Sequence, residues 1–129
     1  MKSYDQIEEF IKLLLQVDKL LNDFIELSKK KPNDAVNKFK LKIANNLLVI
    51  ANKILTKKYM PFEDFDLFDE DNLPTNSDVV LIIAQYVACL KKFGRDSTEY
   101  SDYVHYWVIN GKRSKISADW NLLKEPSKK

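Results

Sequence analysis

The sequence predicts an all-α fold, a single domain like a four-helix bundle, and three observations favour this class. The chain of 129 residues contains only two glycines, and tight turns depend on glycine for positive φ angles. Its hydrophobic fraction of 45% is sufficient to bury one core at this length. Apolar residues recur at intervals of three and four through most of the chain, which is the period of an amphipathic helix. We therefore expect one helical domain over residues 1–129.

The first helix is expected over residues 3–31. Ser3 and Gln6 have the spacing of a capping box, in which the hydroxyl accepts from a helical amide and the glutamine reaches back. Pro32 ends the helix, after three lysines that suit the negative end of the helix dipole. The predicted core face consists of Ile7, Phe10, Leu14, Val17, Leu21 and Phe24.

The second helix is expected over residues 34–58, with Asn33 or Asp34 as its cap. Its predicted core face consists of Val36, Phe39, Ile43, Leu47, Ile50, Ala51 and Ile54. A second stripe at the same spacing mixes apolar and amide side chains, namely Leu41, Asn45, Leu48, Asn52 and Leu55. We interpret its asparagines as bonding to the following loop or facing solvent at the edge of the core, with a recognition face as the alternative.

A long loop is expected over residues 59–75, because this stretch contains two prolines and no sustained helical period. Loops of this length inside compact domains are uncommon and tend to be functional or disordered. Its apolar side chains, Phe62, Phe65, Leu67 and Phe68, predict an ordered segment that wraps around the core.

The third helix is expected over residues 76–93, starting either at a capping pair formed by Thr75 with Asp78 or directly at Asn76 and Ser77. Its residues are apolar almost all round between positions 79 and 90, which predicts a central helix. Gly94 suits the left-handed residue that ends many helices, and we expect the helix to stop there.

The fourth helix is expected over residues 97–109, capped by Asp96 with Glu99. Its periodic residues are Tyr100, Tyr103, Val104, Trp107 and Val108. A small β-hairpin is the alternative, because Asn110-Gly111 between two β-prone runs is a strong hairpin signal. The tail over residues 117–129 is expected to dock a short last helix before Pro126 and to end in a frayed terminus.

The net charge of +2 conceals a strong segregation of charge along the chain. Residues 1–58 carry 12 basic and 7 acidic groups, residues 59–78 carry 7 acidic groups and no basic one, and residues 79–129 carry 9 and 5. A total this small does not favour nucleic acid or an acidic membrane as the default partner. The loop between the second and third helices is therefore an acidic island.

Cysteine usage and hydropathy predict a soluble, cytoplasmic protein. The single Cys89 cannot form an intramolecular disulfide, which favours a reducing compartment. The N-terminus lacks the apolar region of a secretory signal. The longest apolar stretch, over residues 79–90, is shorter than the roughly 18 to 20 residues that a membrane span needs.

No motif in the sequence names an activity. The acidic loop lacks the glycine and the alternating ligands of a calcium-binding loop, and one cysteine with one histidine is too few for a usual zinc site. Neither Cys89 nor a serine stands at a spacing from His105 that favours nucleophilic catalysis. We expect no cofactor, no metal and no catalytic residue, and a small helical enzyme is the second alternative.

The alternation of acidic and aromatic side chains in the loop predicts protein binding. Aromatic anchors within an anionic field suit a basic partner. We expect a non-catalytic interaction module, such as an immunity- or antitoxin-like inhibitor or a small accessory subunit. The predicted contact residues are Phe62, Glu63, Asp64, Phe65, Asp66, Phe68, Asp69, Glu70 and Asp71. The phenylalanines either point towards the partner or pack inward and leave only the acids at the surface.

A subunit that associates with RNA or DNA is the first alternative. Lys30, Lys31, Lys112 and Arg113 are the basic residues that would contact phosphates in that case. Lysines at helix ends are ordinary, however, and the acidic loop repels a polyanion.

Overall fold

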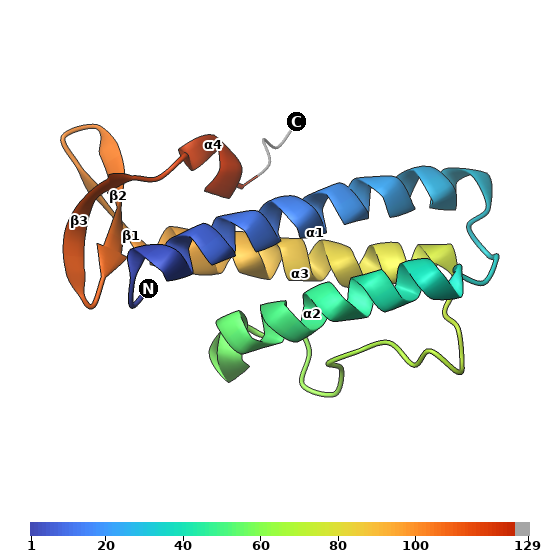
Figure 1. The fold of residues 1–129 in the computed structure, drawn as a ribbon. Coiled ribbons are helices and arrows are strands. Elements are labelled where there is room, and N and C mark those ends of the chain that lie inside the picture. The colour runs from blue at the N-terminus through green and yellow to red at the C-terminus, as the bar shows by residue number, and fades with distance from the viewer. Residues whose placement is uncertain (126–129) are drawn as a thin grey trace.

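The computed structural model describes residues 1–125 and has a mixed α+β fold, in which three long helices lie side by side and a small sheet closes one end (Figure 1). The elements in chain order are α1 (Tyr4–Lys30), α2 (Lys38–Tyr59), α3 (Asn76–Asp96), β1 (Thr98–Ser101), β2 (Val104–Ile109), β3 (Lys112–Ser117) and α4 (Trp120–Leu123). The predicted all-α class is therefore wrong, although the molecule is mostly helical. The frayed end expected after Pro126 lies outside the described residues.

Local capping explains where α1 begins. The Ser3 hydroxyl accepts a hydrogen bond from the Gln6 amide at 3.1 Å, and the Gln6 side chain accepts one from the Lys2 amide. The buried face of α1 consists of Ile7, Phe10, Leu13, Leu14, Val17 and Phe24. This face packs mainly against α3, which lies at the centre of the molecule (Figure 1).

α2 differs from its prediction in both its start and its buried face. It begins after Asn37, whose side chain accepts from the Lys40 amide at 3.0 Å, rather than after Asn33 or Asp34. The chain before it is instead held against the start of α3, because the Val36 amide donates to the Pro74 carbonyl and Ala35 forms an isolated β-bridge with Thr75.

The buried face of α2 is the stripe that contains the asparagines, namely Leu41, Ala44, Asn45, Leu48, Ala51 and Leu55. Of the predicted core face, Phe39 is 71% exposed and Ile43 and Ile50 are also exposed. The buried stripe is the less apolar of the two, and the hydrogen bonds of its asparagines to the distant loop are what the wholly apolar stripe cannot make.

α3 begins at Thr75, which forms a complete capping box with Asp78. The prediction that Gly94 ends this helix is wrong, since α3 continues to Asp96 and Gly94 is buried within it. A Cβ atom at Gly94 would lie only 2.6 Å from Cδ2 of Leu123 and 3.0 Å from Cζ of Phe10. The glycine is therefore needed for the close approach of α1 and α4 to α3.

The predicted helix over residues 97–109 is wrong, and the alternative hairpin is present. β1, β2 and β3 form an antiparallel sheet in that order. Asn110 and Gly111 join β2 to β3 with φ angles of 51° and 76°, and Asp102 and Tyr103 join β1 to β2 with φ angles of 51° and 69°. Positive φ at both central residues is what a type I′ turn requires, and such turns match the twist of the strands they connect.

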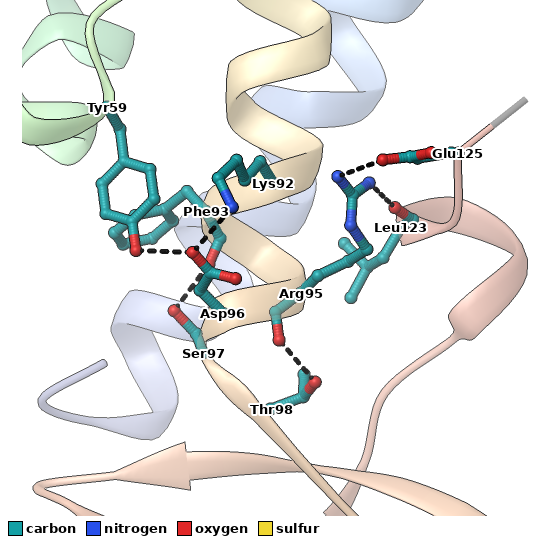
Figure 2. A network of polar contacts seen from close by, with 9 residues as sticks. All are labelled: Tyr59, Lys92, Phe93, Arg95, Asp96, Ser97, Thr98, Leu123 and Glu125. Atoms are coloured by element: carbon teal, nitrogen blue, oxygen red, sulfur yellow. Dashed lines mark hydrogen bonds and ion pairs between the residues drawn. The ribbon is translucent and has the colours of Figure 1, made fainter.

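Polar contacts join the end of α3 to the sheet, to α4 and to the end of α2 (Figure 2). Asp96 accepts a hydrogen bond from the Tyr59 hydroxyl at 2.8 Å and pairs with Lys92 at 3.4 Å. These partners lower the pKa of the Asp96 carboxyl, the Tyr59 hydrogen bond having the largest effect. Arg95 donates to the Leu123 carbonyl at 2.8 Å, so α4 is held against the last turn of α3. Within residues 1–125, no helix is both long and apolar enough to cross a membrane.

Candidate protein-binding surface

The acidic segment, residues 62–71, runs back along α2 before the chain enters α3 (Figure 1). It contains no helix or strand, yet its backbone is fixed by side chains of the helices beneath it. Asn45 on α2 donates to the Phe68 carbonyl at 2.9 Å and accepts from the Phe68 amide at 2.8 Å. A buried amide side chain thus replaces the main-chain partner that a neighbouring strand would supply.

A second anchor lies two residues earlier in the acidic segment. Asn52 donates to the Asp66 carbonyl at 2.9 Å, and the Tyr86 hydroxyl on α3 donates to the Asn52 side chain at 2.7 Å. Burial raises the pKa of Tyr86 to about 12, so this hydroxyl keeps its proton at neutral pH. The asparagines therefore bond to the following loop, as we interpreted them, and do not form an open recognition face.

The phenylalanines of the acidic segment form a chain that leads into the core. Phe68 is 8% exposed, and Phe65 packs between Phe68 and Phe62 with ring centroids 5.0 Å and 6.1 Å away. Phe62 and Phe65 are half-buried, while Leu67 is exposed. Phe68 thus fixes the segment in place, and the aromatic surface left for a partner comes from Phe62 and Phe65.

The carboxylates of the acidic segment point outward and are almost uncompensated. All are exposed except Glu70, which is half-buried and accepts from Asn45 at 3.2 Å. In the described part of the chain, the ion pair of Asp71 with Lys38, at 4.0 Å, is the only one that any of the six makes. Their negative potential is therefore directed into solvent, where a cationic partner would meet it.

A concavity of about 630 Å³ lies at the start of the acidic segment, next to a break in α2 at Thr56. Met60, Phe62 and Phe65 supply its apolar lining. Glu63, Asp64 and Asp66 supply carboxylates, with one lysine, Lys57, on the helix side. An apolar hollow with an acidic rim is a suitable receptor for a side chain that is apolar along its stem and cationic at its tip.

Comparison with known proteins adds no family or relative to this description. No protein-family model matches the chain, and neither a curated protein nor a solved structure is significantly similar to it.

The basic residues proposed for nucleic-acid contact are not brought together. Lys30 and Lys31 lie at the end of α1, whereas Lys112 and Arg113 lie at the start of β3, beside the opposite end of that helix (Figure 1). α1 has 27 residues, so these pairs are separated by about 40 Å of helix. Arg113 is also engaged within the sheet, 3.8 Å from Glu99 and over the ring of Tyr106.

The residues considered for catalysis have structural contacts. His105 is stacked on Trp120 with ring centroids 3.6 Å apart, which joins β2 to α4. Burial raises the pKa of the Cys89 thiol, so the nucleophilic thiolate is disfavoured. Over residues 1–125, no group of three or more His, Cys, Asp and Glu side chains is placed to hold a metal ion.

Proposed function

We propose that this protein is a non-catalytic binding module that recognises a basic protein partner through the acidic segment. The observation that carries the proposal is that its exposed carboxylates stand on an ordered backbone and make only one ion pair among residues 1–125. Complementary charge accelerates association and selects the partner. A segment that is already ordered loses less conformational entropy on binding than a mobile loop would.

The proposed partner inserts a lysine or arginine into the concavity lined by Met60, Phe62 and Phe65. Its cationic tip meets Glu63 and Asp64, while the apolar stem covers the half-buried rings. The exposed Leu67 adds an apolar contact farther along the segment. An inhibitor or accessory subunit of a basic protein fits this chemistry. The separation of the four basic residues by the length of α1 argues against nucleic acid as the ligand.

The test is capture of partners from a lysate of the source cells by the immobilised protein, followed by mass spectrometry. Glu63→Lys/Asp64→Lys reverses two exposed charges whose side chains make no hydrogen bond or ion pair within residues 1–125. We expect at least tenfold lower capture of a basic partner by this variant, with thermal stability nearly unchanged.

The matched control is Glu8→Lys/Glu9→Lys, which makes the same change in net charge on the exposed face of α1. We expect it to retain the partner. Equal capture of a basic protein by the two variants, or the absence of any basic protein among those captured, would show that the acidic segment is not the interface.

A further inference from the structure

Three helices packed side by side leave three grooves between neighbours, and the chain itself fills two of them. The acidic segment covers the α2/α3 groove, where it bonds to Asn45, Asn52 and Tyr86. α4 covers part of the α1/α3 groove, where Leu123 lies against Phe10 and Gly94. The third groove, between α1 and α2, is an open concavity of about 700 Å³.

The α1/α2 groove is apolar along its floor. Phe24 is buried at its base, Leu20, Leu27 and Leu47 are half-buried, and Phe39 and Ile43 are exposed. Soluble proteins rarely leave such a contiguous set of large apolar side chains uncovered unless it contacts another molecule. Phe39 is the clearest case, because 71% of this large aromatic side chain is exposed to solvent on the surface of α2.

Exposed and half-buried apolar side chains continue along α2 in a helical stripe. Phe39, Ile43 and Leu47 line the groove, and Ile50 and Ile54 follow at the same helical spacing. From Phe39 to Ile54 the stripe is about 22 Å long. This length and spacing fit an amphipathic helix of about four turns laid along the groove, a common mode of peptide recognition.

The charges around the groove select an acidic occupant. α2 contains six lysines and no acidic residue, and Lys40 is the one of the six that lines the groove. The two carboxylates on the α1 side are already paired, Asp23 with Lys19 at 3.8 Å and Glu26 with Lys29 at 3.1 Å. Lys30 and Lys40 also line the groove, and neither forms an ion pair in the described part of the chain. The same lysines disfavour a second copy that packs α2 against α2, because like charges would face each other.

We propose that the α1/α2 groove binds an amphipathic helix of a partner protein whose polar face is acidic. This site is independent of the acidic segment, since it lies on a different flank of α2 and has the opposite charge. A protein with both sites would join a basic partner to an acidic helix.

The test uses a displayed library of 18-residue peptides with a fixed leucine and isoleucine stripe at helical spacing and random polar positions. We expect selection on the full-length protein to enrich Asp and Glu at the polar positions. The affinity of an enriched, fluorescently labelled peptide is then measured by anisotropy. Phe39→Ser/Ile43→Ser is expected to weaken binding at least tenfold and to remain folded, because both side chains are exposed.

Leu81→Ser is the matched control, because Leu81 is a 61% exposed apolar residue on α3 and should not affect the peptide. Lys30→Glu/Lys40→Glu should shift the enrichment from acidic to basic peptides. Failure to enrich acidic helices, or equal weakening by Leu81→Ser, would overturn the proposal. Sedimentation that shows a dimer of the wild type and a monomer of Phe39→Ser/Ile43→Ser would also overturn it, since a second copy would then occupy the groove.

Discussion

At the scale of single residues, Asn45 does more to shape the proposed interface than any carboxylate in it. Its amide satisfies both the N–H and the C=O of Phe68, groups that are buried together with the phenylalanine ring. Without these bonds the backbone of the acidic segment would carry unpaired polar groups into the core, which is costly. An apolar residue at position 45 would suit the helix but not the loop.

Replacement of Asn45 should therefore destabilise the protein and release the acidic segment. We expect Asn45→Ala to lower the free energy of unfolding by about 2–3 kcal/mol, because the two hydrogen bonds to Phe68 and the one to Glu70 are lost and buried backbone groups are left unpaired. Asn46→Ala, at the exposed neighbouring position, should change it by less than about 0.5 kcal/mol. Urea denaturation measures the free energy of unfolding of both variants. Hydrogen exchange at the Phe68 amide should accelerate only in Asn45→Ala. Equal stability of the two variants would contradict this role of Asn45.

At the scale of elements, the sequence predicts what local interactions decide. The caps at Ser3 and Thr75 and the apolar periods of α1 and α3 depend on residues within a few positions of each other. The buried face of α2 is not decided by such local contacts, because it depends on the hydrogen bonds of Asn45 to Phe68, which lies 23 positions away. The position of the acidic segment was accessible from its composition, but the depth of each phenylalanine was not.

Residues 97–109 also depend on contacts that their local helical period does not reveal. Their aromatic and β-branched side chains fit a helical period, yet they also suit strands. β1 and β2 pair with each other within this stretch, and β2 also pairs with β3, which lies beyond it. The Asn110-Gly111 turn is the local feature that distinguishes the two, since both residues have positive φ. In this stretch the Asn-Gly turn is therefore a better indicator of the structure than the helical period of the side chains.

The other hairpin turn carries a residue that does not suit its conformation. Tyr103 has a φ of 69° and is 93% exposed, so its ring gains little packing to offset the strained backbone. We expect Tyr103→Gly to raise the free energy of unfolding by about 0.5–1 kcal/mol, because glycine adopts this φ without strain. Gly111→Ala is the converse variant, since φ is 76° and no atom of residues 1–125 lies within 4 Å of an added Cβ. We expect it to be destabilising by about 1 kcal/mol. The midpoint temperature of thermal unfolding should rise in Tyr103→Gly and fall in Gly111→Ala. A shift in the same direction in both variants would contradict the idea that backbone strain causes the two effects.

At the scale of the whole molecule, tyrosine hydroxyls connect elements that are far apart in the sequence. Tyr86 on α3 bonds to Asn52 on α2, which in turn holds the acidic segment. Tyr59 at the end of α2 bonds to Asp96, where α3 meets the sheet (Figure 2). Both bonds have the hydroxyl as donor and therefore require the protonated form.

Stability should consequently decline at alkaline pH. Burial raises the pKa of Tyr86 to about 12, and burial and the Asp96 carboxylate raise the pKa of Tyr59, whereas both groups ionise near pH 10 when unfolded. The unfolded chain thus binds fewer protons than the folded one between these values, so the stabilisation is complete below pH 10 and is lost as the pH rises towards 12. We expect Tyr86 to contribute a slope of up to about 1.4 kcal/mol per pH unit in that interval. Urea denaturation at a series of pH values from 8 to 12 measures this slope, with Tyr86→Phe as the comparison. Tyr86→Phe should be less stable than the wild type at pH 8, because it has lost the bond to Asn52. Its free energy of unfolding should fall less steeply above pH 10. An equal slope in the two proteins would assign the alkaline transition to other groups.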